Sequence, residues 1–129
     1  MAASSPTAKR VVRSIPFAAP HVFVLAVVEG PDLNGAHRIA RSTTVIGRGP
    51  GADWTLGDDE ISKQHCTIRY DAGLCHVVDA ASLNGTTVND RPLRRGVALR
   101  LRHLDEIQLG GTRLLFLIGR FAERPPKAV

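Results

Sequence analysis

Short apolar stretches alternate with polar turn residues along most of the chain. From residue 21 onward, runs rich in Val, Ile, Leu and Thr are separated by clusters of Gly, Asn, Asp and Pro, which is the pattern of β-strands joined by turns. No helical periodicity interrupts them. The expected strands cover residues 21–28, 36–42, 43–47, 53–56, 65–70, 74–79, 86–89, 97–101, 106–109 and 112–118. Strands at this spacing predict an all-β sandwich or barrel.

The length of 129 residues allows one domain with a single core. Residues 1–20 are rich in Ala, Ser, Pro and Arg and contain no acid, so we expect a flexible basic tail, followed by a folded domain over 21–118 and a basic tail or linker over 119–129. An organelle transit peptide would share the composition of residues 1–20 and stays an alternative. No apolar run reaches the ~18 residues of a membrane span, so we expect a cytoplasmic protein without a membrane partner.

Positive charge lies mainly at the two ends of the chain. The sequence pI of about 10.0 at first suggests a nucleic-acid partner. Residues 1–20 and 119–129, however, hold six of the 17 basic residues and one of the 12 acidic residues, which leaves 11 of each in 21–118. Non-specific affinity for nucleic acid needs several Lys and Arg on one face. The neutral body therefore disfavours nucleic-acid binding, except through the tails.

Two cysteines flank a predicted hairpin turn at Asp71-Ala72-Gly73. We expect Ile68 opposite Cys75 and Cys66 opposite Val77, which makes the cysteines diagonal neighbours beyond the ~7 Å limit for a disulfide. Their spacing also does not suit a metal site. The sequence therefore predicts two buried free thiols, a reducing compartment and no metal.

Three polar clusters lie between the expected strands. They are Gly47-Arg48, Ser62-Lys63-Gln64-His65 and Ser82-Leu83-Asn84-Gly85-Thr86. Because strands send their loops to the ends of a β architecture, these clusters could converge. Each alone has an ordinary explanation as a solvated arginine or a turn. Together, a guanidinium fork, a hydroxyl and an ammonium would complete a phosphate site.

Hydrolytic chemistry is the alternative use of Ser62 and His65, as a nucleophile and its base. It would need an orienting carboxylate, and the nearest acids, Asp58, Asp59 and Glu60, form an exposed-looking run. No Gly-x-Ser-x-Gly elbow is present either. The chain is therefore expected to be non-catalytic, with no cofactor and no small-molecule substrate.

The order of these motifs resembles a known family. Gly47-Arg48, the segment LGDDEISKQHC, the segment DAASLNGT and the segment LDEIQLG follow one another with strands between them. Over about residues 22–118 this combination is similar to a forkhead-associated (FHA) domain. The resemblance implies an eleven-stranded sandwich of two antiparallel sheets that binds phosphothreonine peptides through loops at one end. It also implies a threonine-phosphorylated partner protein and an upstream Ser/Thr kinase.

The resemblance also divides the loop residues by role. Phosphate contacts are implied for Arg48, Ser62 and Lys63, and a hydrogen bond to the peptide backbone for Asn84. Support of the loops is implied for Gly47, His65 and Gly85. Two further positions bear on specificity: Glu60, which lies where resembling domains contact the third residue after the phosphothreonine, and Leu83, which replaces a hydroxyl that helps to hold the phosphate in some members.

Two turns depart from the family pattern. Leu104 stands where many members have Gly, and Asn89-Asp90 replaces a frequent Asn-Gly hairpin. Thr7 is a candidate phosphorylation site that could act as a ligand within the same chain. A different function, phosphorylation-independent interaction or assembly, stays open for another surface of the sandwich. The residues considered for that surface are Arg91, Arg94, Arg95, Arg100 and Arg102.

Overall fold

A computed structural model describes residues 21–120. The tail expected at 1–20, with Thr7, lies outside the described residues, as do residues 121–129 of the tail expected at 119–129, whose first two residues belong to a strand. The described chain consists of strands, turns and loops. The strands are β3 (His21–Glu29), β4 (Ala36–Ile39), β5 (Thr43–Gly47), β6 (Trp54–Thr55), β7 (Cys66–Asp71), β8 (Leu74–Asp79), β9 (Thr86–Val88), β10 (Arg91–Pro92), β11 (Leu99–Arg100), β12 (Glu106–Leu109) and β13 (Thr112–Arg120).

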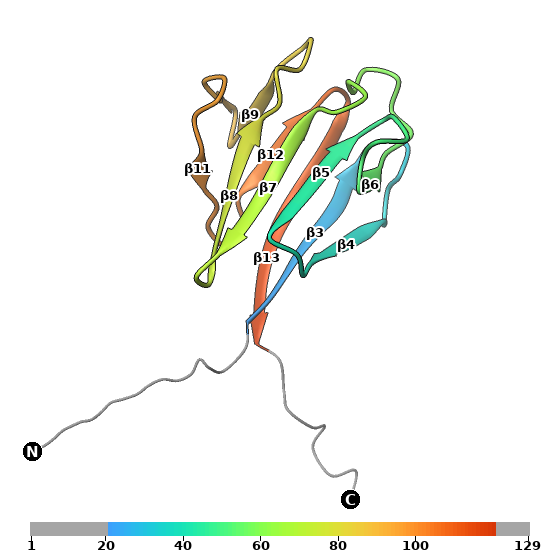
Figure 1. Ribbon diagram of the computed structural model, residues 1–129. Coiled ribbons are helices and arrows are strands. Elements are labelled where there is room, and N and C mark those ends of the chain that lie inside the picture. Colours follow the sequence, from blue (N-terminus) through green and yellow to red (C-terminus); the bar gives the residue numbers. More distant parts are fainter. Residues whose placement is uncertain (1–20, 121–129) are drawn as a thin grey trace, which may run out of the picture. The chain divides into compact units, whose positions relative to one another are not determined.

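These strands form two sheets, with the order β10-β9-β12-β13-β3-β4 in one and β11-β8-β7-β5-β6 in the other. Figure 1 shows β8, β7 and β5 in front of β12, β13 and β3. The pairs β10–β9, β9–β12, β12–β13, β3–β4, β5–β7, β7–β8 and β8–β11 are antiparallel, whereas β5 and β6 are parallel. The predicted all-β, eleven-stranded sandwich is therefore confirmed. The two-residue strand β10 was not expected, because exposed Arg91 and Pro92 carry no apolar alternation.

Alternating side chains build the core between the sheets. Phe23, Leu25 and Val27 of β3 are buried, as are Leu114 and Phe116 of β13. The rings of Phe23 and Phe116 stack with centroids 6.0 Å apart. Each fully buried apolar side chain of this size contributes about 1.5–3 kcal/mol. Residues 23–118 form one compact unit; of a second unit, made of the chain ends, only residues 21, 22, 119 and 120 are described.

The predicted hairpin of β7 and β8 is present, but its predicted register is wrong by two residues. Tyr70 pairs with Cys75, and Ile68 pairs with Val77. Only Ala72 and Gly73 form the turn, both with positive φ (52° and 80°), as a tight two-residue hairpin turn requires. The assumed pairs would have placed the two-residue turn one position earlier, at Asp71 and Ala72.

Both cysteines are buried free thiols, as expected. Burial raises the pKa of Cys66 to about 12 and that of Cys75 to about 11. The charge of Asp79 adds to the effect on Cys66. Because the thiolate is the reactive form, burial and the raised pKa disfavour reaction at both thiols in the folded chain.

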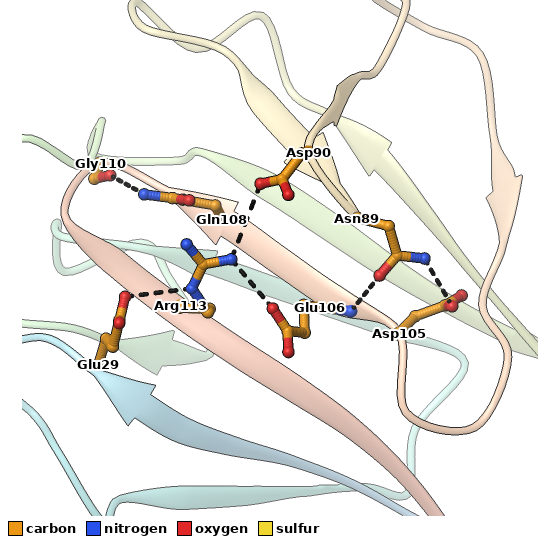
Figure 2. Close-up of polar contacts among 8 residues, drawn as sticks. All are labelled: Glu29, Asn89, Asp90, Asp105, Glu106, Gln108, Gly110 and Arg113. Carbon is orange, nitrogen blue, oxygen red and sulfur yellow. Dashed lines mark hydrogen bonds and ion pairs between the residues drawn. The ribbon is translucent and has the colours of Figure 1, made fainter.

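The Asn89-Asp90 turn takes the conformation that Asn-Gly would favour. Asn89 and Asp90 have φ of 51° and 68°. The Asn89 side chain fixes the turn: its Oδ1 accepts from Glu106 N–H at 2.9 Å, and its Nδ2 donates to Asp105 at 2.9 Å. Figure 2 shows both bonds. Asn and Asp tolerate positive φ better than other side chains do, so this departure from the family pattern changes little.

Leu104 departs from the family pattern at greater conformational cost. Its φ is 75°, and its side chain is 55% exposed. Its N–H donates to Phe116 O at 2.7 Å, and the flanking Asp105 caps the turn by accepting from Arg102 N–H at 2.7 Å. A left-handed conformation costs a leucine about 1–2 kcal/mol. The surrounding hydrogen bonds therefore hold Leu104 in a strained turn.

Asp79, at the end of β8, organises the segment that follows it. Its carboxylate accepts from the Ser82 hydroxyl at 2.6 Å, from Ser82 N–H at 3.1 Å and from the Thr86 hydroxyl at 2.7 Å. Burial alone would raise the pKa of Asp79, but these hydrogen bonds outweigh it and lower the pKa below its ordinary value. Ionised Asp79 therefore stabilises the fold.

The described part of the chain contains no helix long and apolar enough to span a membrane.

Replacing Leu104 by glycine should relieve the strained turn. We compare Leu104→Gly with Leu104→Ala, because both remove the side chain and only glycine accepts positive φ without strain. Relief of the strain stabilises Leu104→Gly relative to Leu104→Ala, whereas the greater chain entropy of glycine in the unfolded state offsets part of that gain. The net free energy of unfolding of Leu104→Gly should be higher than that of Leu104→Ala by about 0.5–1 kcal/mol. Urea denaturation measures both. An equal or lower stability of the glycine variant would contradict the strain.

Replacing Asp79 by asparagine should destabilise the domain in a pH-dependent way. At pH 7 the variant loses the charge that accepts three hydrogen bonds, so its free energy of unfolding should fall by about 2–3 kcal/mol. Because the folded pKa is lowered, this contribution is complete above the unfolded-state pKa of about 3.9 and is lost as pH falls through the folded pKa. Urea titrations from pH 7 down to pH 3 should therefore show that the difference in free energy of unfolding between wild type and Asp79→Asn becomes smaller.

The matched control for this prediction is Asp71→Asn. Asp71 is an exposed carboxylate at the hairpin turn, so its substitution should change the free energy of unfolding by less than about 0.5 kcal/mol. If the difference in free energy of unfolding between wild type and Asp79→Asn does not depend on pH, the charge of Asp79 does not contribute to stability.

Candidate functional site

Three loops meet at one end of the sandwich because of the register of β5, β7 and β8. Ile46 near the end of β5 pairs with Cys66 at the start of β7, and Cys66 pairs with Asp79 at the end of β8. The loops 48–53, 56–65 and 80–85 therefore leave the same edge (Figure 1, top). The three polar clusters predicted to converge lie on these loops.

The first two loops run together because Gly47 has no side chain. A Cβ on Gly47 would lie 2.0 Å from Lys63 O, and a Cβ on Gly49 would lie 2.9 Å from the Lys63 side chain. Gly49 N–H donates to that same Lys63 carbonyl at 3.1 Å. Any larger residue at position 47 would force the loops apart. Gly47 thus fixes the distance between the backbone of Arg48 and the loop that carries Lys63.

Arg48 is held against the second loop by two hydrogen bonds. Its N–H donates to Ser62 O at 3.0 Å, and its Nε donates to Ile61 O at 2.9 Å. The side chain is nevertheless exposed, as is that of Lys63. Since Nε is engaged, the two Nη groups form the exposed end of the guanidinium. This end can face a ligand at the edge of the sandwich.

His65 joins the second loop to the third and to strand β5 from inside the domain. The side chain is fully buried (0% exposed). Its Nδ1 accepts from Ser62 N–H at 3.0 Å, and its Nε2 lies 2.8 Å from Gly85 O. These partners assign the hydrogen to Nε2, which donates to the carbonyl. The His65 backbone adds bonds to Ile46 O and Ala80 N–H.

The ring of His65 therefore cannot serve as a base for Ser62. One ring nitrogen is occupied by a backbone N–H and the other by a backbone carbonyl. A catalytic pair would need one of them to accept a hydrogen bond from the Ser62 hydroxyl. The pair is arranged for support of the loops and not for proton transfer.

Ser62 and Asn84 connect the second loop with the third. Leu83 N–H donates to Ser62 Oγ at 3.0 Å, and Asn84 Nδ2 donates to Glu60 O at 3.2 Å. Because Ser62 Oγ accepts this bond, its own hydrogen can be donated elsewhere. Leu83 is 85% exposed, so an apolar side chain stands free beside the polar loops.

Asp58 was expected to lie in an exposed run, and this is wrong: it is only 7% exposed. One carboxylate oxygen accepts from Glu60 N–H at 2.9 Å, and the other accepts from Gly111 N–H and the Thr112 hydroxyl at 2.8 Å each. Burial would raise the pKa of Asp58, but these bonds lower it. The carboxylate anchors the second loop to the β12–β13 turn, while Asp59 and Glu60 are exposed.

A pocket of about 310 Å³ adjoins the loops on the side of Glu60 and Asn84. Asp90, Gln108 and Gly110 also line it, and Figure 2 shows these three residues close to Arg113. Two carboxylates, those of Glu60 and Asp90, thus border the pocket. This side of the three-loop end is therefore negatively charged, whereas Arg48 and Lys63 carry positive charge.

Arg113 neutralises part of the acidic surface beyond this pocket. It donates to Glu29 at 3.1 Å and to Glu106 at 3.0 Å, and lies 3.9 Å from Asp90 (Figure 2). Exposed pairs of this kind contribute little to stability. Glu60 forms no ion pair within residues 21–120, and its carboxylate stays open to a ligand.

The sequence reasoning missed the anchoring carboxylates. The sequence gives a weak sign of the Asp79 network, because an acid at the end of a predicted strand is followed by hydroxyl residues three and seven positions later, Ser82 and Thr86. Asp58 gave no sequence signal of its anchoring role, because the two partners that tie it to the β12–β13 turn lie 53 and 54 residues away. Within residues 21–120 no cluster of three or more His, Cys, Asp or Glu side chains is placed to hold a metal ion.

Comparison with known proteins agrees with this geometry. A family model described as FHA domain matches residues 44–110. The glycogen accumulation regulator GarA of Mycolicibacterium smegmatis is 40% identical over 96 residues, which cover 74% of this chain and 59% of that protein. The oxoglutarate dehydrogenase inhibitor of Corynebacterium efficiens is 41% identical over 96 residues, covering 74% and 66%. This chain thus matches between 59% and 66% of the length of these curated relatives.

Solved structures share the fold. One, from an analysis of phosphothreonine-dependent FHA domain interactions, has a TM-score of 0.70 at 28% identity and covers 78% of this chain and 99% of its own. The FhaA FHA domain complexed with the intracellular domain of Rv3910 has a TM-score of 0.65 at 29% identity, covering 73% and 98%. The motifs, the sandwich and these matches agree, and the chain belongs to the FHA domain family, a phosphothreonine-binding family.

Proposed function

We propose that this chain is a non-catalytic module that binds a phosphothreonine-containing segment of a partner protein at the three-loop end of the sandwich. The observation that carries the proposal is the convergence of Arg48, Ser62, Lys63 and Asn84 on loops tied together by buried His65. A phosphothreonine brings a charge of about −1.5 to −2 and three strong acceptor oxygens. The site offers matching donors and positive charge.

The phosphate is proposed to lie between Arg48 and Ser62. The exposed Nη groups of Arg48 would donate to two phosphate oxygens, in the bidentate geometry that a guanidinium favours. The Ser62 hydroxyl would donate to a third, since its oxygen already accepts from Leu83 N–H. The exposed ammonium of Lys63 would add a charge that follows the phosphate without fixed geometry.

Asn84 is proposed to hold the backbone of the ligand. Its Nδ2 donates to Glu60 O, so its Oδ1 would accept an N–H from the bound segment. Gly85 supports this arrangement through its φ of 83° and through the bond of its carbonyl to His65. Leu83 has no hydroxyl for the phosphate and would contact an apolar part of the ligand.

Discrimination between phosphothreonine and phosphoserine would depend on shape. Burial of the threonine methyl supplies only about 0.8 kcal/mol, or about fourfold in affinity. Stronger rejection of phosphoserine would require a cavity that fixes the rotamer of the threonine.

Within a cell, the chain is proposed to act in Ser/Thr kinase signalling. Its partner would be a threonine-phosphorylated cytoplasmic protein, and a Ser/Thr kinase would act upstream. Two relatives are named as a regulator of glycogen accumulation and an inhibitor of oxoglutarate dehydrogenase, which supports a regulatory role by binding. The folded domain would extend over residues 21–118, with basic tails before and after it.

A second function, interaction independent of phosphorylation, is favoured by one observation. Arg100 of β11 pairs with His76 of β8, which pairs with Arg69 of β7. Residues opposed in this way point to the same face of a sheet, so Arg69 and Arg100 give this face positive charge on both sides of His76, and an acidic partner would be attracted to it. A partner captured equally by wild type and Arg48→Ala would support this function over the first.

Loss of Arg48 should weaken phosphopeptide binding by at least tenfold, and we expect about a hundredfold. The reason is the removal of charge-assisted hydrogen bonds worth about 1.5–3 kcal/mol each. Calorimetric titration with a phosphothreonine peptide selected from a library, and with its unphosphorylated form, measures the effect in wild type and Arg48→Ala.

The matched control is Arg69→Ala, which removes an exposed arginine from β7, away from the loops. Its affinity should stay within about twofold of wild type, because an exposed charge at a distance is largely screened. Equal affinity for phosphorylated and unphosphorylated peptides, or unchanged affinity in Arg48→Ala, would refute the proposed function.

Glu60 should select the third residue after the phosphothreonine. Because Glu60 borders the acidic pocket, basic or apolar residues should be preferred there over Asp, and Glu60→Lys should reverse the preference by about two- to fivefold. A phosphopeptide array varied at that position provides the measurement. Asp59→Lys, which changes an exposed neighbour, is the control. Enrichment of Asp at that position with wild type would rule the preference out.

A further inference from the structure

The peptide group between Ser82 and Leu83 is held from both sides. Its N–H, from Leu83, donates to Ser62 Oγ at 3.0 Å. Its carbonyl, from Ser82, accepts from Arg95 Nη2 at 3.0 Å. In a trans peptide the N–H and C=O point in opposite directions. Ser62 and Arg95 therefore hold this peptide from opposite edges and fix the directions of its N–H and C=O.

Arg95 reaches this peptide from a separate part of the chain. It lies between β10 and β11, thirteen residues from Ser82. Its neighbour Arg94 is exposed as well; its backbone carbonyl accepts from Val97 N–H at 3.1 Å, but its side chain forms no hydrogen bond or ion pair within residues 21–120. The two arginines carry the same charge one residue apart, and only Arg95 contacts the site loop.

The rest of Ser82 is already fixed by Asp79. Both Ser82 N–H and the Ser82 hydroxyl donate to the Asp79 carboxylate, and the hydroxyl oxygen accepts from Gly85 N–H at 2.9 Å. The carbonyl is the remaining polar group of this residue. Arg95 supplies the donor that sets its direction, and thus the direction of Leu83 N–H.

We propose that Arg95 is a positioning residue of the phosphate site, an inference that rests on the proposed function. By orienting the 82–83 peptide it directs Leu83 N–H to one lone pair of Ser62 Oγ, and this turns the Ser62 hydrogen toward the ligand. The orientation matters more in this chain because Leu83 offers no side-chain donor, which leaves Ser62 as the hydroxyl that meets the phosphate. Arg95 acts through Ser62 and does not itself need to touch the ligand.

The test compares Arg95→Met with Arg94→Met in the full chain. Both variants remove one positive charge and keep an unbranched side chain, but only the first loses the bond to Ser82 O. Binding of a phosphothreonine peptide is titrated at about 0.15 M and about 1 M salt, where the Debye length falls from about 8 Å to about 3 Å. At high salt Arg95→Met should bind about fivefold more weakly than wild type, and Arg94→Met within about twofold.

A second readout follows the hydrogen bond itself without ligand. In the free protein, amide hydrogen exchange at Leu83, measured by NMR, should be faster in Arg95→Met and unchanged in Arg94→Met, with the free energy of unfolding similar in both. An unchanged Leu83 amide, or equal losses of affinity in both variants at high salt, overturns the role of Arg95 and leaves the proposed function intact. Equal binding of phosphorylated and unphosphorylated peptides by wild type overturns the proposed function, and with it this role.

Discussion

The buried imidazole of His65 is the interaction on which the three-loop end of this domain depends. A single uncharged ring bridges an N–H in one loop and a carbonyl in another, while the backbone of the same residue extends the β5–β7 ladder. A side chain with both a donor and an acceptor is needed, because the two loops present groups of opposite kind. Carboxylate, amide or hydroxyl side chains lack this combination at the same separation and rigidity.

Two anionic side chains complete the support that His65 begins. Asp79 accepts hydrogen bonds from the hydroxyls of Ser82 and Thr86 and from the backbone N–H of Ser82. Asp58 links the second loop to the β12–β13 turn by accepting from Gly111 and Thr112. Both are buried, and both have their charge satisfied by several donors, which makes a buried carboxylate tolerable. The exposed groups of the loops are thus held on a rigid base. A ligand would meet them with little ordering still to be done, which favours affinity.

Much of the fold could be predicted because alternation of apolar and polar residues reports local structure directly. It located ten strands, and the family resemblance supplied the number eleven. Strand β10 escaped because two exposed residues carry no alternation. The predicted β7–β8 register was wrong because pairing depends on which two residues form the turn, and here Ala72 and Gly73 form it with positive φ. Alanine has no sequence preference for positive φ, so its identity does not predict this conformation.

The residues of the candidate site could be predicted from the sequence, but the buried carboxylates that hold its loops in place could not. Motif order brought Arg48, Ser62, Lys63 and Asn84 to attention, and the structure places their loops at one end. Two of the three partners of Asp58 lie more than fifty residues away, and an acid next to two exposed acids gives no sign of burial. Contacts between distant segments are set by how the sheets stack, which no local pattern encodes.

The Ala72-Gly73 turn has a practical consequence for studying this protein. β7 and β8 each run the length of the hairpin, from the three loops at one end to this turn at the other. The turn is exposed and makes its bend within two residues. A fluorescent label or a tethering point introduced there would lie a full strand length from the three loops, and would report on or immobilise the domain while leaving the three-loop end open.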